Sequence, residues 1–454
     1  MLQPKKISMK RRFDPSPLTS SIVDQLPIEV LRSIFNKLSF PDFVQAKAVC
    51  SSWNLLGEEF VSKMPWLMLP SKKEVEEGDG IDVKNNGYNG FLNLGENRVY
   101  SLKTTPMEFR ESCCIGSSQG WLVFLGQRAV PFLLNPFRRI KIHVPPVDRI
   151  LGLKKMERNM DGDYEVDYFN DCRSSGFLFM CGKQEVRERF IQKAILTGEP
   201  DSNNENYGLI LLCNYGKEIV YYASGGDNSW TILDGSHPTY QDIICHENNL
   251  YALSDENSIE VWDLRGADGI GIAKRSDIVL PFPEKLVAKA DSLRGLCTTR
   301  FYLVEACGDL LLVVRFIGDY VDGDGTLLQE WDCLADLCNH PKVCPYRTFL
   351  FHVYKLDSDI LEWVEMDSLG DQALFIGGNE SVSISARSFP NCEKNSVYFT
   401  DDNWGHMEED YLYGGHDMGI YNMKDGSVKP IYEFSSEQIQ PPPCWIIPPA
   451  MLES

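Results

Sequence analysis

The chain has 454 residues, more than one hydrophobic core usually organises, so we expect two domains or one domain of repeated units. Its composition, 43% hydrophobic, 11% aromatic and 24% charged, excludes a largely disordered chain. The net charge of −21 disfavours nucleic acid and anionic membranes as partners, because an acidic surface repels phosphates, and it favours a basic protein.

The charge is unevenly distributed along the chain. Residues 1–19 carry five bases and one acid, and residues 20–68 carry four bases and five acids, which leaves a net charge of −24 on the rest. We expect residues 1–19 to form a disordered basic arm, with a nuclear-import signal as the alternative. Met1–Pro17 lacks the apolar core of a signal peptide, and Phe301–Ile317 is too short and too charged to span a bilayer. The fourteen cysteines are therefore expected to be reduced and buried, in a protein of the cytoplasm, the nucleus or both.

Three short helices are predicted between residues 20 and 65. Pro27 suits the first turn of the first helix. Apolar residues then recur at spacings of three and four, at Ile28, Leu31, Ile34, Phe35 and Leu38. Ser39 can cap the second helix, and Asp42 complements its positive end. The third helix places apolar groups on one face, at Trp53, Leu56 and Phe60.

Beyond Leu69 the period changes from helical to alternating, which predicts short strands. The predicted strands are Gly90–Leu94, Trp121–Leu125, Phe177–Met180, Leu209–Cys213, Ile219–Tyr222, Asn249–Leu253, Ile259–Leu264, Tyr302–Glu305, Leu310–Arg315, Phe349–Leu356, Val397–Thr400 and Gly419–Met423. Few helices are expected between them.

A loose echo recurs among these strands, a Gly or Asn turn followed by an apolar strand. It begins at Gly120, Asn249, Gly308 and Asn395. This repetition suggests propeller blades, although its offsets are less regular than those of a clean propeller repeat. The length allows about five to seven blades of four strands each. The predicted fold class is an α+β multidomain chain, with a small three-helix domain followed by an all-β propeller.

The segment Leu26–Leu38, with Asp42 and Val49-Cys50-Ser51-Ser52-Trp53, resembles an F-box. The resemblance implies that residues 20–65 bind a Skp-type adaptor and, through it, a cullin scaffold of a ubiquitin ligase. The residues implied are Leu26, Pro27, Leu31, Ile34, Leu38, Val49, Cys50 and Trp53. The composition agrees, since so many large apolar groups exceed what fifty residues can hide alone. The alternative is that these helices cap the β-domain and turn their apolar faces inward.

The remainder resembles plant F-box proteins that carry a KIB-type β-propeller. The matching segments are Gly116–Leu122, Leu134–Phe137, Trp262–Leu264, Tyr302–Gly308, Phe375–Asn379, Val397–Asp402 and Pro441–Trp445. The resemblance implies that residues 66–448 form a propeller that binds a target protein, and that residues 449–454 form a tail. It does not indicate which propeller residues bind the target. The chain departs from the pattern in an acidic insertion at Asp319–Asp324 and a cysteine-rich stretch at Cys333–Cys344.

Three motifs resemble catalytic or metal-binding sites, but each is better explained as an ordinary structural segment. Gly116-Ser-Ser118-Gln-Gly120 fits the hydrolase nucleophile pattern, but a strand follows where a helix is needed, so Ser118 is predicted to lie in a turn. Cys333, Cys338, His340 and Cys344 lack the paired spacing of structural zinc sites. The loop at Asp319–Gly325 places Tyr320 and Trp331 where a calcium loop needs carboxylates, so we expect a solvated hairpin or an acidic contact for a basic target.

We therefore predict a non-catalytic adaptor subunit with no cofactor and no metal. One alternative is a propeller hydrolase whose carboxylates gather at the channel mouth, with Asp401, Asp402 and Glu409 as candidates. His406 and His416 are expected on loop surface near this face. A third possibility keeps the F-box but uses it outside ubiquitin transfer.

Overall fold

The computed structural model describes residues 26–448 with interruptions. It does not describe residues 36, 60–63, 71–87, 102–111, 127–129, 149, 159–163, 169–177, 183–184, 201–206, 227, 257, 265–273, 323–325, 330–345, 390, 410–413, 433–438 and 440. The chain divides into two compact units, residues 1–62 with 450–454, and residues 63–449. Each unit has its own hydrophobic core.

The first unit contains three helices, as predicted: α1 (Ile28–Phe35), α2 (Phe40–Lys47) and α3 (Ser51–Glu59). Pro27 directly precedes α1, where its missing N–H leaves no bond unmade. Ser39 occupies the N-cap of α2, but its hydroxyl donates to the Asp42 carboxylate at 2.6 Å and accepts no capping bond from a backbone N–H. Ser39 is therefore at the predicted cap position, but its side chain makes no capping hydrogen bond.

The core of the helical unit is small and partly aromatic. Its buried side chains come from all three helices: Leu31, Phe35, Phe43, Ala46 and Leu56. Phe35 meets Phe43 and Trp53 edge-on, each with ring centroids 5.5 Å apart. Leu31 and Phe35 are four residues apart on one face of α1, which explains why both turn inward.

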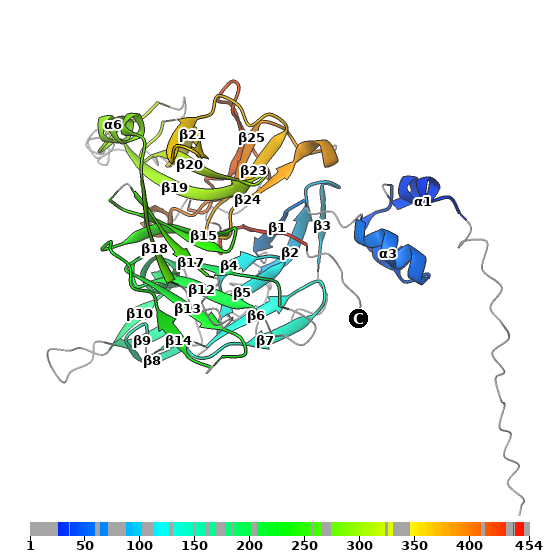
Figure 1. Ribbon diagram of the computed structural model, residues 1–454, viewed down its shortest axis with the longest axis horizontal. Coiled ribbons are helices and arrows are strands. Elements are labelled where there is room, and N and C mark those ends of the chain that lie inside the picture. Colours follow the sequence, from blue (N-terminus) through cyan, green and yellow to red (C-terminus); the bar gives the residue numbers. More distant parts are fainter. Residues whose placement is uncertain are drawn as a thin grey trace, which may run out of the picture. The chain divides into compact units, whose positions relative to one another are not determined.

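The second unit is built from sheets, antiparallel apart from one strand pair in the last, that we number as blades (Figure 1). Blade 1 contains β28 (Cys444–Ile446), β1 (Trp66–Pro70), β2 (Tyr88–Asn93) and β3 (Arg98–Tyr100). Blade 2 contains β4 (Cys113–Ser118), β5 (Trp121–Leu125), β6 (Pro131–Asn135) and β7 (Ile140–His143). Blade 3 contains β11 (Ile191–Leu196), β12 (Gly208–Cys213), β13 (Glu218–Ala223) and β14 (Trp230–Ile232).

The other three blades follow in chain order. Blade 4 contains β15 (Tyr240–His246), β16 (Asn249–Ser254), β17 (Ser258–Asp263) and β18 (Lys274–Pro281). Blade 5 contains β19 (Cys297–Ala306), β20 (Asp309–Gly318), β21 (Arg347–Asp357) and β22 (Glu362–Glu365). Blade 6 contains β24 (Val382–Ser385), β23 (Gln372–Ile376), β25 (Ser396–Phe399), β26 (Gly419–Asn422) and β27 (Val428–Lys429), with β23 and β25 parallel. Each predicted strand overlaps an observed one.

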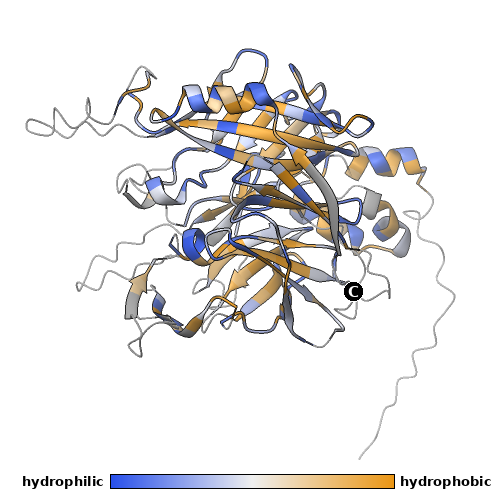
Figure 2. Ribbon diagram, turned by 60° about the vertical axis from the view of Figure 1, so that its left-hand side comes forward, coloured by the Kyte–Doolittle hydropathy of each residue, from blue (hydrophilic) through white to orange (hydrophobic). Residues whose placement is uncertain are grey.

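The blades form a closed ring. The inner strands β4, β11, β15 and β19 contact one another in turn, β19 contacts β24, and β28 contacts β4. Apolar side chains of blade 6 pack with those of blade 1, including Phe375 with Trp445 at a centroid distance of 5.0 Å. The described residues thus form a six-bladed propeller, within the predicted range. Apolar residues concentrate on its strands, whereas the connecting turns are polar (Figure 2).

An additional three-stranded sheet packs beside blades 2 and 3. It contains β10 (Leu178–Cys181), β9 (Tyr164–Tyr168) and β8 (Leu153–Arg158). Its buried side chains share one hydrophobic cluster with those two blades. Because β4 already contacts β11 directly, this sheet supplies no inner strand and is not counted as a blade.

The ring is closed by the C-terminal strand. In blade 1, β28 pairs antiparallel with β1, with Leu67 opposite Trp445 and Met68 opposite Cys444. Strands almost four hundred residues apart therefore share one sheet, and β28 covers the inner edge of β1.

The sequence echo has a physical cause in the turns. Two-residue turns join the first two strands of blades 2, 4 and 5, and both central residues of each have positive φ. These residues are Gln119 and Gly120, Glu247 and Asn248, and Cys307 and Gly308. Such turns match the right-handed twist of a hairpin, and they favour glycine and asparagine.

Helices are sparse in the described part of the second unit, as expected. They include α6 (Glu284–Ser292) before β19, α8 (Trp404–Glu409) before β26, a π-helical turn at Val186–Phe190 and a 3-10 turn at Ala386–Ser388. Across the described residues, none of the helices has the length and apolar character needed to cross a membrane. Ten described cysteines are free thiols, of which six are buried and Cys307 is exposed.

Candidate functional site

The eight predicted adaptor-binding residues occupy different environments in the helical unit. Pro27 and Val49 are exposed. Five are partly buried, namely Leu26, Ile34, Leu38, Cys50 and Trp53. Leu31 is only 7% exposed and belongs to the core of the unit. Its side chain therefore has little surface to offer a partner, and its replacement would test folding more than docking.

Other apolar side chains of the same unit are exposed, although they were not among the predicted adaptor-binding residues. They are Ile28, Val30, Val44 and Leu55. Exposed fractions reach 56% for Val49 and 60% for Leu55. A three-helix unit with a small core thus keeps several branched side chains in solvent, where their burial by a partner would be favourable.

Ser118 was predicted to lie in a turn, but it is the last residue of β4, directly before the turn at Gln119 and Gly120. Strand β5 begins at Trp121, so a strand follows the serine. Its hydroxyl accepts a hydrogen bond from the backbone N–H of Leu196 at 3.0 Å, which joins blade 2 to blade 3. The neighbouring Ser117 donates to the carbonyl of Trp445 at 2.6 Å. Both serines therefore hold blades together.

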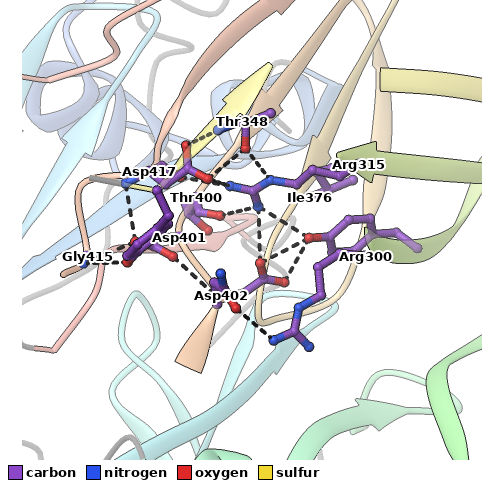
Figure 3. Close-up of polar contacts among 12 residues, drawn as sticks. Arg300, Arg315, Thr348, Ile376, Thr400, Asp401, Asp402, Gly415 and Asp417 are labelled. Atoms are coloured by element: carbon purple, nitrogen blue, oxygen red, sulfur yellow. Dashed lines mark hydrogen bonds and ion pairs between the residues drawn. The ribbon is translucent and has the colours of Figure 1, made fainter. Parts of the chain in front are cut away.

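A concentrated group of charges in the described part of the propeller surrounds Arg315 of β20 (Figure 3). This guanidinium is fully buried. It donates to the carboxylate of Asp417 at 2.9 Å and to that of Asp402 at 3.1 Å. Its other bonds reach Thr348 Oγ1 at 2.7 Å and the Thr400 carbonyl at 2.9 Å. The cluster connects blade 5 to the segments that flank β25 and β26.

Two of the candidate catalytic carboxylates belong to this internal cluster. Asp402 accepts from the hydroxyl of Tyr302 at 3.0 Å as well as from Arg315. Asp401 accepts from the Tyr346 hydroxyl and from the backbone N–H of Gly415 at 3.0 Å. Both carboxylates are thus held by protein donors. The side chain of Glu409 lies outside the described residues.

Burial gives Asp401 an unusual protonation equilibrium. Loss of hydration raises the pKa of this carboxyl to about 7, and the nearby negative charge of Asp417 adds to the effect. The folded state therefore binds a proton that the unfolded chain releases near its ordinary pKa of 3.8. Between these two pKa values, the free energy of unfolding falls as the pH rises.

We expect Asp401→Asn to flatten this pH dependence. The full chain should lose stability between pH 5 and pH 8, and the variant should lose less over the same window, whatever its absolute stability. Urea unfolding at several pH values measures both slopes. Asp359→Asn, at an exposed position, is the control and should leave the slope unchanged. Equal slopes for Asp401→Asn and the unmodified chain would contradict the assignment.

A second buried ion pair joins three inner strands. Lys193 of β11 pairs with Asp242 of β15. The Asp242 carboxylate also accepts from the backbone N–H of Leu303 in β19 at 2.8 Å. Burial raises the pKa of Asp242, although Lys193 acts in the opposite direction. The Asp242 carboxylate thus links the inner strands of blades 3, 4 and 5.

The remaining motifs are only partly within the described structure. The cysteine-rich set Cys333, Cys338, His340 and Cys344 lies outside the described residues. In the acidic insertion, Val321 forms an isolated antiparallel bridge with Leu327, and the N–H of Thr326 donates to the Asp322 carboxylate at 2.8 Å. These contacts are typical of the predicted hairpin. His406 lies 3.7 Å from Asp319, and both are partly buried.

Family comparisons agree with this architecture. The family described as KIB1-4 beta-propeller matches residues 91–422, and an F-box-like domain matches residues 23–60. The chain belongs to the KIB1-4 β-propeller family. The family match runs from blade 1 into blade 6, and the F-box-like match contains α1, α2 and α3.

Relatives of this chain occur in Arabidopsis thaliana. The chain is 26% identical to the putative F-box protein At4g22660 over 424 residues, which covers 90% of this chain and 92% of the relative. It is 24% identical to the F-box protein KIB3 over 395 residues, which covers 83% of this chain and 70% of the relative. Among solved structures, the WD40 repeats of RRP9 match with 9% identity and a TM-score of 0.28, covering 84% of this chain and 99% of that one.

The sequence pattern did not predict the cluster around Arg315. In the sequence, Arg315 is one of the charged residues within the apolar stretch Phe301–Ile317. The available signal was its place in a strand whose other residues are nearly all apolar, since a buried arginine needs carboxylate partners. Asp402 and Asp417 supply them from more than eighty residues away.

Proposed function

We propose that this protein is the substrate-recognition subunit of an SCF-type ubiquitin ligase. In this proposal the helical unit binds a Skp-type adaptor, which links it to a cullin, and the propeller binds the target protein. The chain itself performs no bond chemistry. The observation that carries the proposal is the combination of an F-box-like unit, rich in exposed apolar side chains, with a separate β-propeller.

Several physical features support this division of labour. The two units have separate cores, so docking of the first need not disturb the second. Exposed aliphatic groups such as Val49 would each contribute about 1.5 to 3 kcal/mol if a partner buried them fully. The candidate catalytic carboxylates Asp401 and Asp402 have structural partners, which favours a binding role over hydrolysis. We place this activity in the cytoplasm, the nucleus or both.

We expect Pro27→Asp combined with Val49→Asp to weaken adaptor binding at least about 100-fold. The two changes put charges on exposed apolar positions, and loss of two buried side chains would remove several kcal/mol. Pro27 and Val49 both lie just before helices, where an acidic residue is compatible with folding. Capture of a recombinant Skp-type adaptor by the full chain, followed by calorimetric titration, measures the effect.

The matched control places the same charge on exposed aliphatic residues of the propeller. Ile232→Asp and Ile360→Asp should capture the adaptor as well as the unmodified chain, because both are more than half exposed and lie in the other unit. Co-purification of a cullin with the adaptor complex would support the ligase assignment. Undiminished capture by the folded Pro27 and Val49 double variant would refute the docking surface.

A further inference from the structure

The propeller contains a cavity of about 370 Å³ where the inner strands of blades 3, 4 and 5 begin. Polar and aromatic residues make up most of its lining. They include Glu188, Gln192, Tyr215, Arg300, Tyr302 and Trp404. The volume lies in the range of ligand sites, but most such sites are lined by apolar groups. This lining therefore suits an occupant with charges and hydrogen-bonding groups of its own.

Most charges of the cavity wall are already neutralised. Lys193 and Asp242 form an ion pair with each other. Asp402 is paired with Arg315 and accepts a bond from Tyr302. Because each of these charges already has a partner of opposite charge in the protein, none of them needs a ligand for neutralisation. They shape the cavity but add no unpaired charge to it.

Arg300 differs from these groups, since no described carboxylate pairs with it. It belongs to β19, where it is directly opposite Arg315 in β20. Its guanidinium is turned away from Arg315 and donates to the Asn403 side-chain oxygen at 3.2 Å (Figure 3). Its Nε is buried and has no hydrogen-bond partner among the described residues. Two arginines on directly opposed positions repel each other, and only Arg315 has carboxylates within reach.

Arg187 adds a second positive charge behind the same wall. It is 3% exposed and donates to backbone carbonyls, those of Cys114 at 3.1 Å and of Gln192 at 2.9 Å. Its guanidinium lies 4.9 Å from the ring centre of Trp404, a cavity residue. In the described structure it forms no ion pair with a carboxylate, so this side of the cavity favours an anionic group.

One negative charge faces the same space. Glu188 lines the cavity, is partly buried, and makes no hydrogen bond or ion pair through its carboxylate within the described residues. It lies in the π-helical turn Val186–Phe190, a form of backbone that is frequent at functional sites. The cavity thus presents an unpaired cation, Arg300, and an unpaired anion, Glu188.

Tyr215 forms an aromatic part of the rim and is held in an unusual conformation. Asn214, Tyr215 and Gly216 have φ values of 54°, 60° and 76°. A side chain at Gly216 would meet the Tyr240 carbonyl oxygen at 2.2 Å, so the turn can close only with glycine there. Tyr215 is 50% exposed as a result. Strained backbone that presents an aromatic ring at a cavity is often associated with binding.

We propose that this cavity receives an acidic side chain from a segment of the target protein that is otherwise basic. Arg300 pairs with the inserted carboxylate, and Glu188 pairs with a neighbouring lysine or arginine of the segment. Tyr215 and Trp404 contact the chain on either side of the inserted residue. This inference rests on the proposed function and specifies how that function selects its target.

Charge favours a peptide of this kind over two other occupants. Outside its first 68 residues the chain has a net charge of −24, which attracts a basic segment and repels a polyanion such as a phosphorylated one. An apolar small molecule would leave the unpaired groups of Arg300 and Glu188 buried without partners. A basic segment with one carboxylate satisfies both the long-range attraction and the local pairing.

Two pools of synthetic nonapeptides test the proposal. They are identical mixtures of Lys, Arg, Ala, Ser and Leu at eight positions, with Glu at the centre of one pool and Gln at the centre of the other. The immobilised full chain should retain the Glu pool about tenfold more than the Gln pool, as expected for one charge-assisted bidentate pair. Mass spectrometry of the retained peptides measures both this ratio and the enrichment of Lys and Arg.

Variants at the two unpaired groups separate their roles. Arg300→Gln should abolish the preference for Glu, and Arg300→Lys should keep part of it, because the charge remains without the planar fork. Glu188→Gln should keep the preference for Glu but reduce the enrichment of Lys and Arg. Arg294→Gln, at a side chain that is 83% exposed, is the control and should change nothing.

The outcomes distinguish this inference from the proposed function. Adaptor capture is measured on the same preparations, and every variant should capture as well as the unmodified chain. Equal retention of the two pools, retention of neither, or an Arg300→Gln variant that still prefers Glu would overturn the inference while adaptor capture stands. A free dicarboxylate such as glutarate that binds when no peptide does would also overturn it, in favour of a small-molecule site.

Discussion

Replacement of Arg315 by methionine is expected to destabilise the propeller by about 3 to 5 kcal/mol, the usual effect of removing one partner from a buried ion pair. Methionine fills similar space but leaves the carboxylates of Asp402 and Asp417 without their cation. The hydrogen bonds from Arg315 to Thr348 and to the Thr400 carbonyl are lost as well. Urea unfolding monitored by tryptophan fluorescence measures the loss at pH 7.5.

Two further variants show whether charge is the cause. The triple variant Arg315→Met, Asp402→Asn, Asp417→Asn should recover part of the stability, because it leaves no unpaired charge. The single Arg315→Met variant should also regain stability as the pH is lowered, since protonation neutralises the abandoned carboxylates. Arg294→Met removes an exposed arginine and should have almost no effect. A loss for Arg315→Met that is the same at pH 5 and pH 8 would contradict the electrostatic explanation.

Local patterns were sufficient to predict the three helices of the first unit and twelve of the 28 strands in the described part of the second unit. The spacing of Leu31 and Phe35 indicates one helical face, and Pro27 and Ser39 mark where helices begin. The strand at Leu310–Arg315 could be predicted because its length and apolar character differ from those of the flanking turns. The repeated pattern at Gly120 and Gly308 correctly indicated hairpins, because these turns require positive φ, which glycine adopts easily.

Features that depend on distant pairing could not be predicted from one sequence. Strands such as β4, which contains Gly116 and two serines, have weak periodicity, and their strand identity comes from neighbours on both sides. The inward position of Leu31 was also missed, because a helical pattern shows which residues share a face but not what covers it. The partners of Arg315 are invisible for the same reason, since they are supplied by the closed ring.

Closure of the ring by β28 leads to the second large expected effect, that of Trp445. This side chain is 2% exposed, donates through its indole N–H to the Ile376 carbonyl at 3.0 Å, and packs against Phe375. Its own carbonyl accepts from Ser117 at 2.6 Å and from Asn379 at 3.3 Å. Trp445→Ala is expected to lower the free energy of unfolding by about 3 to 5 kcal/mol, as for other buried tryptophans. Removal of residues 444–454 should have a larger effect, because it also exposes the inner edge of β1.

Limited proteolysis of the full chain and its truncations tests this role of β28. A chain that ends at Pro443 should be cleaved within the blades under conditions that leave the unmodified propeller intact, since β1 and β4 both lose their neighbour. A chain that ends at Pro448 keeps β28 and should resist the protease like the complete chain. The two truncations differ by five residues, so a difference between them can be attributed to the closing strand. Equal resistance of both would mean that contacts between blades, and not the shared sheet, keep the ring closed.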